Sequence, residues 1–117
     1  MAAEFENPDP YADRREHPRE QVRIPAKALF GKGSEAIDCI IVDRSMKGMR
    51  IRLGPGQSVP NSFMVLETAA ARVHEVVAAW KAYPDVGLSV HKAYDIRTAA
   101  GPNADQLRRV WREATSR

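Results

Sequence analysis

Short segments in which apolar and polar residues alternate are the feature that most limits what this chain can fold into. The clearest cover residues 22–30, 49–53 and 86–90, and each has the two-residue period of a strand with one buried face. Residues 37–42 and 63–66 are short apolar runs that also favour strands. No helical stretch separates these segments, so parallel crossovers are excluded and the strands are expected to pair antiparallel.

The segment 72–83 mixes good helix formers with valines and aromatic residues. We predict a strand, because a turn at Pro84 and Asp85 follows it and residues 86–90 alternate beyond that turn as a hairpin partner. The apolar neighbours of Trp80 indicate a core residue instead of a stacking platform.

Other local signals limit the elements. Pro25 suggests an edge position or a bulge in the first segment. The second strand is expected to stop at Asp43, where the polar break 43–48 begins. After a connector over 91–102, apolar residues recur at helical spacing from Asn103, a candidate N-cap. Five or six strands and one amphipathic helix predict a mainly β fold, a small closed or nearly closed barrel with the helix packed on it.

The length of 117 residues is that of one domain. We divide it into a flexible tail (1–13), a β-barrel domain with its connector (14–102) and a C-terminal helix (103–117). Neither an export signal nor a membrane span is present, so no membrane insertion is expected. The single cysteine, Cys39, is expected to be a buried, inert thiol, and together these features predict a cytoplasmic location.

The residue types that most enzymes need are poorly arranged. His17, His74 and His91 are scattered, and no spacing of theirs matches a metal site. Ser45 has neither a nearby histidine nor a glycine-flanked elbow, and no glycine-rich phosphate loop precedes a helix. We therefore expect neither an enzyme nor a bound metal or cofactor.

Positively charged residues cluster in one short part of the sequence. Eighteen Lys and Arg against fifteen Asp and Glu leave a formal charge of +3, and four arginines, Arg14, Arg15, Arg19 and Arg23, lie close together. Arg presents a planar fork that suits phosphates and guanine edges. Solvated surface groups paired with neighbouring glutamates are the alternative.

Two short patterns carry more information together than either does alone. Arg15 and Arg19 have the spacing RxxxR, and Asp43, Ser45 and Gly48 have the spacing DxSxxG one strand pair later. This pair of motifs, in this order, resembles the PilZ domain family.

The resemblance extends from about residue 14 to about residue 90. It implies a six-stranded antiparallel PilZ-type β-barrel that binds cyclic di-GMP, a bacterial second messenger with two guanines and two phosphates. Residues 86–90, Val-Gly-Leu-Ser-Val, depart from the Gly-Val-x-Phe ending that is more usual in the family.

The residue chemistry agrees with such a ligand. Arg15 and Arg19 can donate to guanine O6 and N7 and to phosphate oxygens. Asp43 can accept from guanine N1 and N2, Ser45 can add a hydroxyl contact, and Gly48 either has positive φ or leaves space for the ligand. Asp43 and Ser45 could instead simply cap a tight turn.

Two further arginines leave alternatives open. Arg14 adds a third cation before the pair, so one or two stacked cyclic di-GMP molecules can be accommodated. The Arg19 to Arg23 spacing is a second RxxxR register, ranked below the first because Arg23 lies between Val22 and Ile24 in a predicted strand.

A chain without an output domain is expected to act as an adaptor. Ligand binding would order the arginine-rich segment and present a new surface to an unidentified protein partner. The resemblance suggests motility, surface-polysaccharide or attachment machinery. One alternative is a ligand-free interaction module of the same fold. Another is a small basic protein that binds DNA or RNA, which the modest charge and the absence of a recognition helix disfavour.

Overall fold

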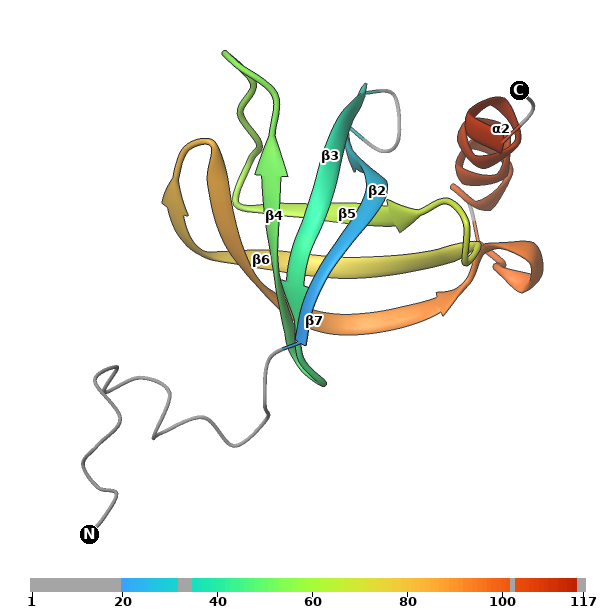
Figure 1. Cartoon of the computed structure of the whole chain (residues 1–117). Coiled ribbons are helices and arrows are strands. Elements are labelled where there is room, and N and C mark those ends of the chain that lie inside the picture. The colour runs from blue at the N-terminus through green and yellow to red at the C-terminus, as the bar shows by residue number, and fades with distance from the viewer. Residues whose placement is uncertain (1–19, 32–34, 102, 116–117) are drawn as a thin grey trace, which may run out of the picture.

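The computed structural model describes residues 20–31, 35–101 and 103–115. In chain order its elements are β2 (Glu20–Phe30), β3 (Glu35–Arg44), β4 (Gly48–Leu53), β5 (Ser62–Glu67), β6 (Arg72–Ala82), β7 (Asp85–Asp95), the 3-10 helix η1 (Ile96–Thr98) and α2 (Ala104–Thr115). Neighbouring strands are antiparallel throughout, and the order β2-β3-β4-β7-β6-β5 closes on itself into a ring (Figure 1). The mainly β fold with a terminal helix is confirmed.

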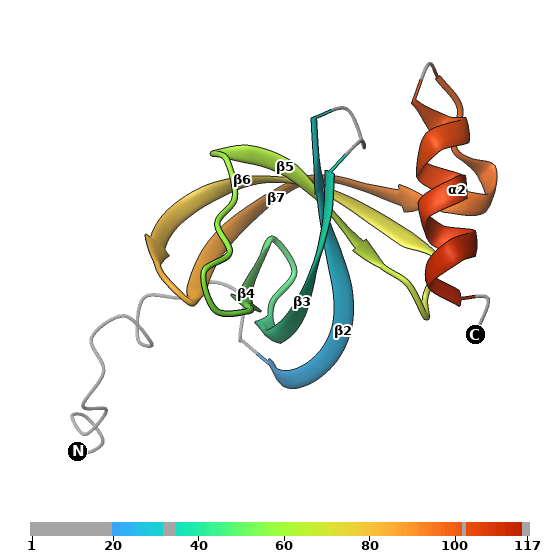
Figure 2. The ribbon, with the colours of Figure 1, turned by 90° about the horizontal axis from the view of Figure 1, so that it is seen from above.

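The ring encloses an apolar interior. In both views β2, β3 and β4 run across β5, β6 and β7 (Figures 1 and 2). Alternate side chains of every strand point inward and fill the space between the two groups of strands. This is the packing that the apolar-polar alternation predicts. The buried members of this interior cluster are Ala26, Ala28, Cys39, Ile41, Met49, Ile51, Leu53, Val59, Phe63, Val65, Val76, Val86 and Leu88. Burial raises the pKa of the Cys39 thiol to about 12, in agreement with the buried, inert thiol predicted.

A second apolar cluster lies outside the ring and is covered by α2. Strand residues Leu29, Leu66 and Val73 meet Ile96 of η1 and Leu107 of α2, and all five are buried. The predicted packing of the helix on the strands is therefore confirmed.

Polar contacts also join α2 to the rest of the chain. The indole Nε1 of Trp111 donates to the carbonyl of Thr68 at 3.0 Å, and Arg108 donates to the carbonyl of Ala99 at 2.7 Å. In the described part of the chain, no helix has the length and apolar character needed to cross a membrane.

Two predicted strand ends were wrong. β3 continues through Asp43 and Arg44, because a bulge between Ile41 and Asp43 restores pairing with β4 beyond it. β7 extends to Asp95, well into the segment expected to be a connector, because the long strand β6 supplies partners as far as Asp95.

Pro25 occupies a local edge position within the closed ring, which is one of the two alternatives predicted. The register shift of β2 lies before it, between Gln21 and Ile24. The pairing of β2 with β5 covers only residues 27–29. Pro25 thus has a paired strand on one side alone, and its missing N–H costs no bond to β5.

Candidate functional site

The DxSxxG residues form a tight connection between β3 and β4, residues 43–48, which we call the motif turn. The amide of Ser45 donates to the carbonyl of Gly48 at 2.8 Å, and the amide of Val90 on β7 donates to the carbonyl of Lys47 at 2.9 Å. The turn is therefore closed within itself and also joined to the next strand of the ring. Met46 at its tip is 78% exposed.

The structure locates each predicted residue of this motif. Asp43 is on β3 and only 5% exposed, Ser45 is half-buried in the turn, and Gly48 is buried as the first residue of β4. The expectation of positive φ at Gly48 was wrong, since among the described glycines those with positive φ are Gly31, Gly56 and Gly101. Gly48 pairs with Ser89 and has extended backbone because β4 begins there. The alternative that its missing side chain leaves space stays a prediction.

A row of alternating charges runs from the motif turn across the outer surface. Arg50 Nε donates to Asp43 Oδ2 at 2.9 Å, and Arg50 Nη1 donates to Asp85 Oδ2 at 2.8 Å. Arg52 Nε donates to Asp85 Oδ1 at 2.8 Å. The predicted placement of both arginines on one face of β4 is confirmed. Hydrogen bonding from Arg52 is the main cause that lowers the pKa of the Asp85 carboxyl.

The prediction that Trp80 is a core residue was wrong. It is 45% exposed and lies against the backbone of Gly87, where an added Cβ would be 2.1 Å from its Nε1. Strict alternation from Val76 and Ala78 would direct Trp80 to the interior, but a register shift between Ala78 and Trp80 turns it to the outer side. The only local signal was a glycine opposite a large aromatic residue.

The strand register gathers these groups on one surface. Trp80 pairs with Gly87, Gly87 with Arg50, and Arg50 with Asp43, so the four lie in one row across β6, β7, β4 and β3. At the usual strand spacing the row is about 14 Å long. We call this surface the motif face; its members are Asp43, Ser45, Gly48, Arg50, Trp80, Gly87 and Ser89. Its centre is formed by the small residues Gly48, Gly87 and Ser89, and the Trp80 indole covers Gly87.

Behind the motif turn, three polar side chains meet inside the ring. Arg44 Nη1 donates to Glu67 Oε1 at 3.0 Å, and His74 Nε2 lies 3.2 Å from the same oxygen. Glu67 and His74 are buried. Burial lowers the pKa of His74, Glu67 opposes that shift, and Arg72 and Arg44 add to it. A carboxylate oxygen only accepts, so a neutral His74 carries its proton on Nε2 and donates.

The arginines of the RxxxR motif, Arg15 and Arg19, lie outside the described residues, as does Arg14. Glu20, the first described residue, pairs with Arg44 of the motif turn. Arg23 is an exposed residue of β2, as predicted.

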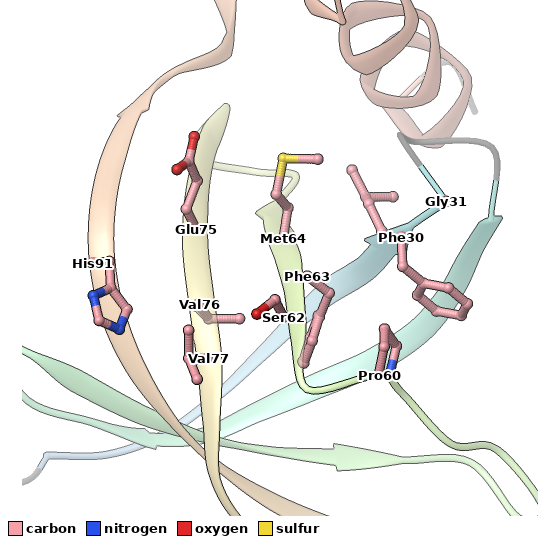
Figure 3. A pocket seen from close by; sticks show the side chains of 11 residues that line it. Phe30, Gly31, Pro60, Ser62, Phe63, Met64, Glu75, Val76, Val77 and His91 are labelled. Atoms are coloured by element: carbon pink, nitrogen blue, oxygen red, sulfur yellow. The ribbon is translucent and has the colours of Figure 1, made fainter.

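A separate hollow of about 690 Å³ lies along β5 and β6 (Figure 3). Phe30, Phe63, Met64 and Val76 line it, and none of the motif residues Asp43 to Gly48 does. Its lining is mainly apolar and offers few groups to a charged nucleotide. We therefore locate the candidate site on the chemistry of the motif face, not on the volume of this hollow.

No protein-family model matches the chain, and no curated protein matches its sequence.

Proposed function

We propose that this chain is a cyclic di-GMP receptor of the PilZ type, with the ligand bound on the motif face. The observation that carries the proposal is the pairing of Glu20 with Arg44. Arg19 is joined to Glu20 by one peptide bond, a span of about 3.8 Å between Cα atoms. The segment that carries the RxxxR motif is therefore attached to the ring at Glu20, beside the motif turn.

The chemistry of the motif face supports a guanine nucleotide. Asp43 is a nearly buried carboxylate that pairs with Arg50, and carboxylate oxygens are acceptors of the kind that guanine N1 and N2 require. The exposed indole of Trp80 offers a flat surface on which a base can stack. The Trp80 indole already covers Gly87, so in this proposal the ligand lies over Gly48 and Ser89, which pair across β4 and β7 and carry small side chains. Arg15 and Arg19 would supply the positive charge that two phosphates require.

In this proposal the protein acts as an adaptor. Ligand contacts of Arg15 and Arg19 immobilise the segment that carries them, and the charge-assisted hydrogen bonds offset the loss of conformational entropy. A partner protein then recognises the new surface. The six-stranded ring with its terminal helix agrees with the barrel that the PilZ resemblance implies.

Calorimetric titration tests the binding step. Cyclic di-GMP, GTP and a short duplex DNA are titrated into the wild-type chain and into a variant with Arg15→Ala and Arg19→Ala. We expect saturable binding of cyclic di-GMP alone and its loss in the double variant. The fitted stoichiometry, with Arg14→Ala as a further variant, decides between one and two ligands.

A second pair of variants tests the role of Asp43. Asp43→Asn replaces an acceptor by an amide that also donates, so affinity is expected to fall about 10- to 100-fold, the equivalent of losing a charged hydrogen bond. Asp38→Asn is the matched control, because Asp38 is exposed on the same strand and pairs with Lys27. Absence of heat at roughly tens of micromolar ligand, with folded protein, would leave the ligand-free interaction module. Binding of DNA alone would support the nucleic-acid alternative.

A further inference from the structure

Arg44 lies in the middle of the motif but does not face the same way as its neighbours. The carboxylate of Asp43 contacts Arg50 on the outer surface, whereas the guanidinium of Arg44 contacts Glu67 inside the ring. His74, which shares this contact, pairs with Val65 of the interior cluster. Two consecutive residues are therefore held by ion pairs on opposite sides of the sheet, which restrains the backbone that carries Ser45.

Stability alone gives little reason for a buried charged group at this place. Replacing a buried ion pair by apolar side chains of similar size is often neutral or stabilising, because the charges must lose their hydration. A hydrogen-bonded ion pair is directional, so unlike apolar packing it fixes the position of a particular atom. Two donors, from Arg44 and His74, converge on a single oxygen of Glu67.

Glu67 is itself fixed by the chain around it. It ends β5, and the next residue, Thr68, accepts a hydrogen bond from Trp111 of α2 and another from the amide of Ala71. The amide of Ile96 donates to the carbonyl of Ala71 at 2.7 Å. The oxygen that Arg44 contacts thus belongs to a segment anchored by η1 and α2.

We propose that Glu67 and His74 are positioning residues, which hold Arg44 and through it the Asp43–Ser45 backbone in the geometry that binds the ligand. They lie behind the motif face and do not touch the ligand. This inference rests on the proposed function, since it names what holds the same site in place. It also predicts a property of the unliganded chain, so that its own failure can be distinguished from failure of the function.

The informative variant removes the ion pair without leaving a buried charge. In Arg44→Met with Glu67→Gln, the Gln amide oxygen still accepts from His74 and the Met side chain covers the place of the Arg stem. In Glu67→Gln alone, the amide oxygen still accepts from Arg44 and His74. Its amide exchange and ligand association rates are therefore expected to lie between those of this variant and the wild type. Lys27→Met with Asp38→Asn removes a different pair between β2 and β3 and is the matched control.

Amide hydrogen exchange tests the unliganded chain. In the Arg44→Met, Glu67→Gln variant the amides of Ser45 and Val90, which close the motif turn, are expected to exchange at least about tenfold faster. The amide of Leu53, bonded to Pro84 at the other end of β4, is expected to keep its rate. The control variant should change none of the three.

Ligand kinetics test the link to binding. If the motif turn of the Arg44→Met, Glu67→Gln variant has the geometry that binds the ligand for only a tenth of the time, its affinity for cyclic di-GMP falls tenfold. The loss comes from slower association, at an unchanged dissociation rate. Faster exchange together with slower association supports the proposal. Unchanged exchange, or unchanged association despite faster exchange, overturns it. If the wild type binds no cyclic di-GMP, the proposed function fails and this inference falls with it.

Discussion

Two outer surfaces of the ring differ in their residues and in what covers them. The surface over Leu29, Leu66 and Val73 is apolar and is covered by η1 and α2. The motif face lies on β3, β4 and the hairpin end of β6 and β7, which is the end away from α2 (Figures 1 and 2), and it consists of ion pairs, glycines and an exposed indole. The chain completes the first surface with its own helix.

The second surface combines two features that are unusual in a surface with no further role. A carboxylate, Asp43, is nearly buried at the sheet surface, while a tryptophan, Trp80, is nearly half exposed. Buried polar groups and exposed large apolar groups are the informative exceptions to normal burial. These two residues stand at the ends of one row across the sheet, and this combination distinguishes the motif face from the apolar surface that α2 covers.

The largest expected effect is on the helix-covered surface. Ile96→Ala removes a fully buried side chain and should lower the free energy of unfolding by about 2–5 kcal/mol, whereas Ile96→Val should cost about 0.5–1.5 kcal/mol. Urea titration measures both. Affinity of the folded variants for cyclic di-GMP should equal that of the wild type; an affinity loss that follows the stability loss would show that the two surfaces are not independent.

A smaller effect is expected at the motif face. Gly87→Ala puts a methyl group where the Trp80 indole lies, so the indole must leave the strand, at a cost of about 1–3 kcal/mol. Tryptophan emission in a Trp111→Phe background should move to longer wavelength, because Trp80 becomes more solvated. Gly54→Ala, whose new Cβ would be 3.8 Å from Gln57 Cγ, is the control. Unchanged emission would contradict the stacked arrangement.

The smallest effect concerns the interior behind the motif turn. The pKa of His74 is lowered in the folded state from 6.5, mainly by burial, so the unfolded chain binds the proton more readily. The free energy of unfolding should therefore fall as the pH decreases below about 6.5 and be flat above it. His74→Gln should reduce this slope, while His91→Gln, at an exposed position on β7, should retain it. Equal slopes in both variants would show that His74 is not responsible.

The strands were predictable because their signal is local. The alternation at 49–53 places Ile51 inside and both Arg50 and Arg52 outside, as the structure has them. Asp43, Ser45 and Gly48 were identified by spacing alone, and their convergence follows from the short connection between β3 and β4. None of this depends on which strands close the ring.

Trp80 and the end of β3 were mispredicted for one shared reason. Each lies at a bulge, between Ala78 and Trp80 on β6 and between Ile41 and Asp43 on β3. One extra residue reverses the side to which the following side chains point. A period-2 pattern cannot show this, because the energy of a bulge depends on the partner strand.

The amino-acid sequence by itself determined the elements and the chemistry of this protein: alternating strands, one amphipathic helix, a motif turn and a set of arginines. Only the tertiary structure decided which groups meet. It paired Trp80 with Gly87 and directed Asp43 outward and Arg44 inward to Glu67. Periodicity is set by neighbours along the chain, whereas register, bulges and closure are set by contacts between strands distant in sequence.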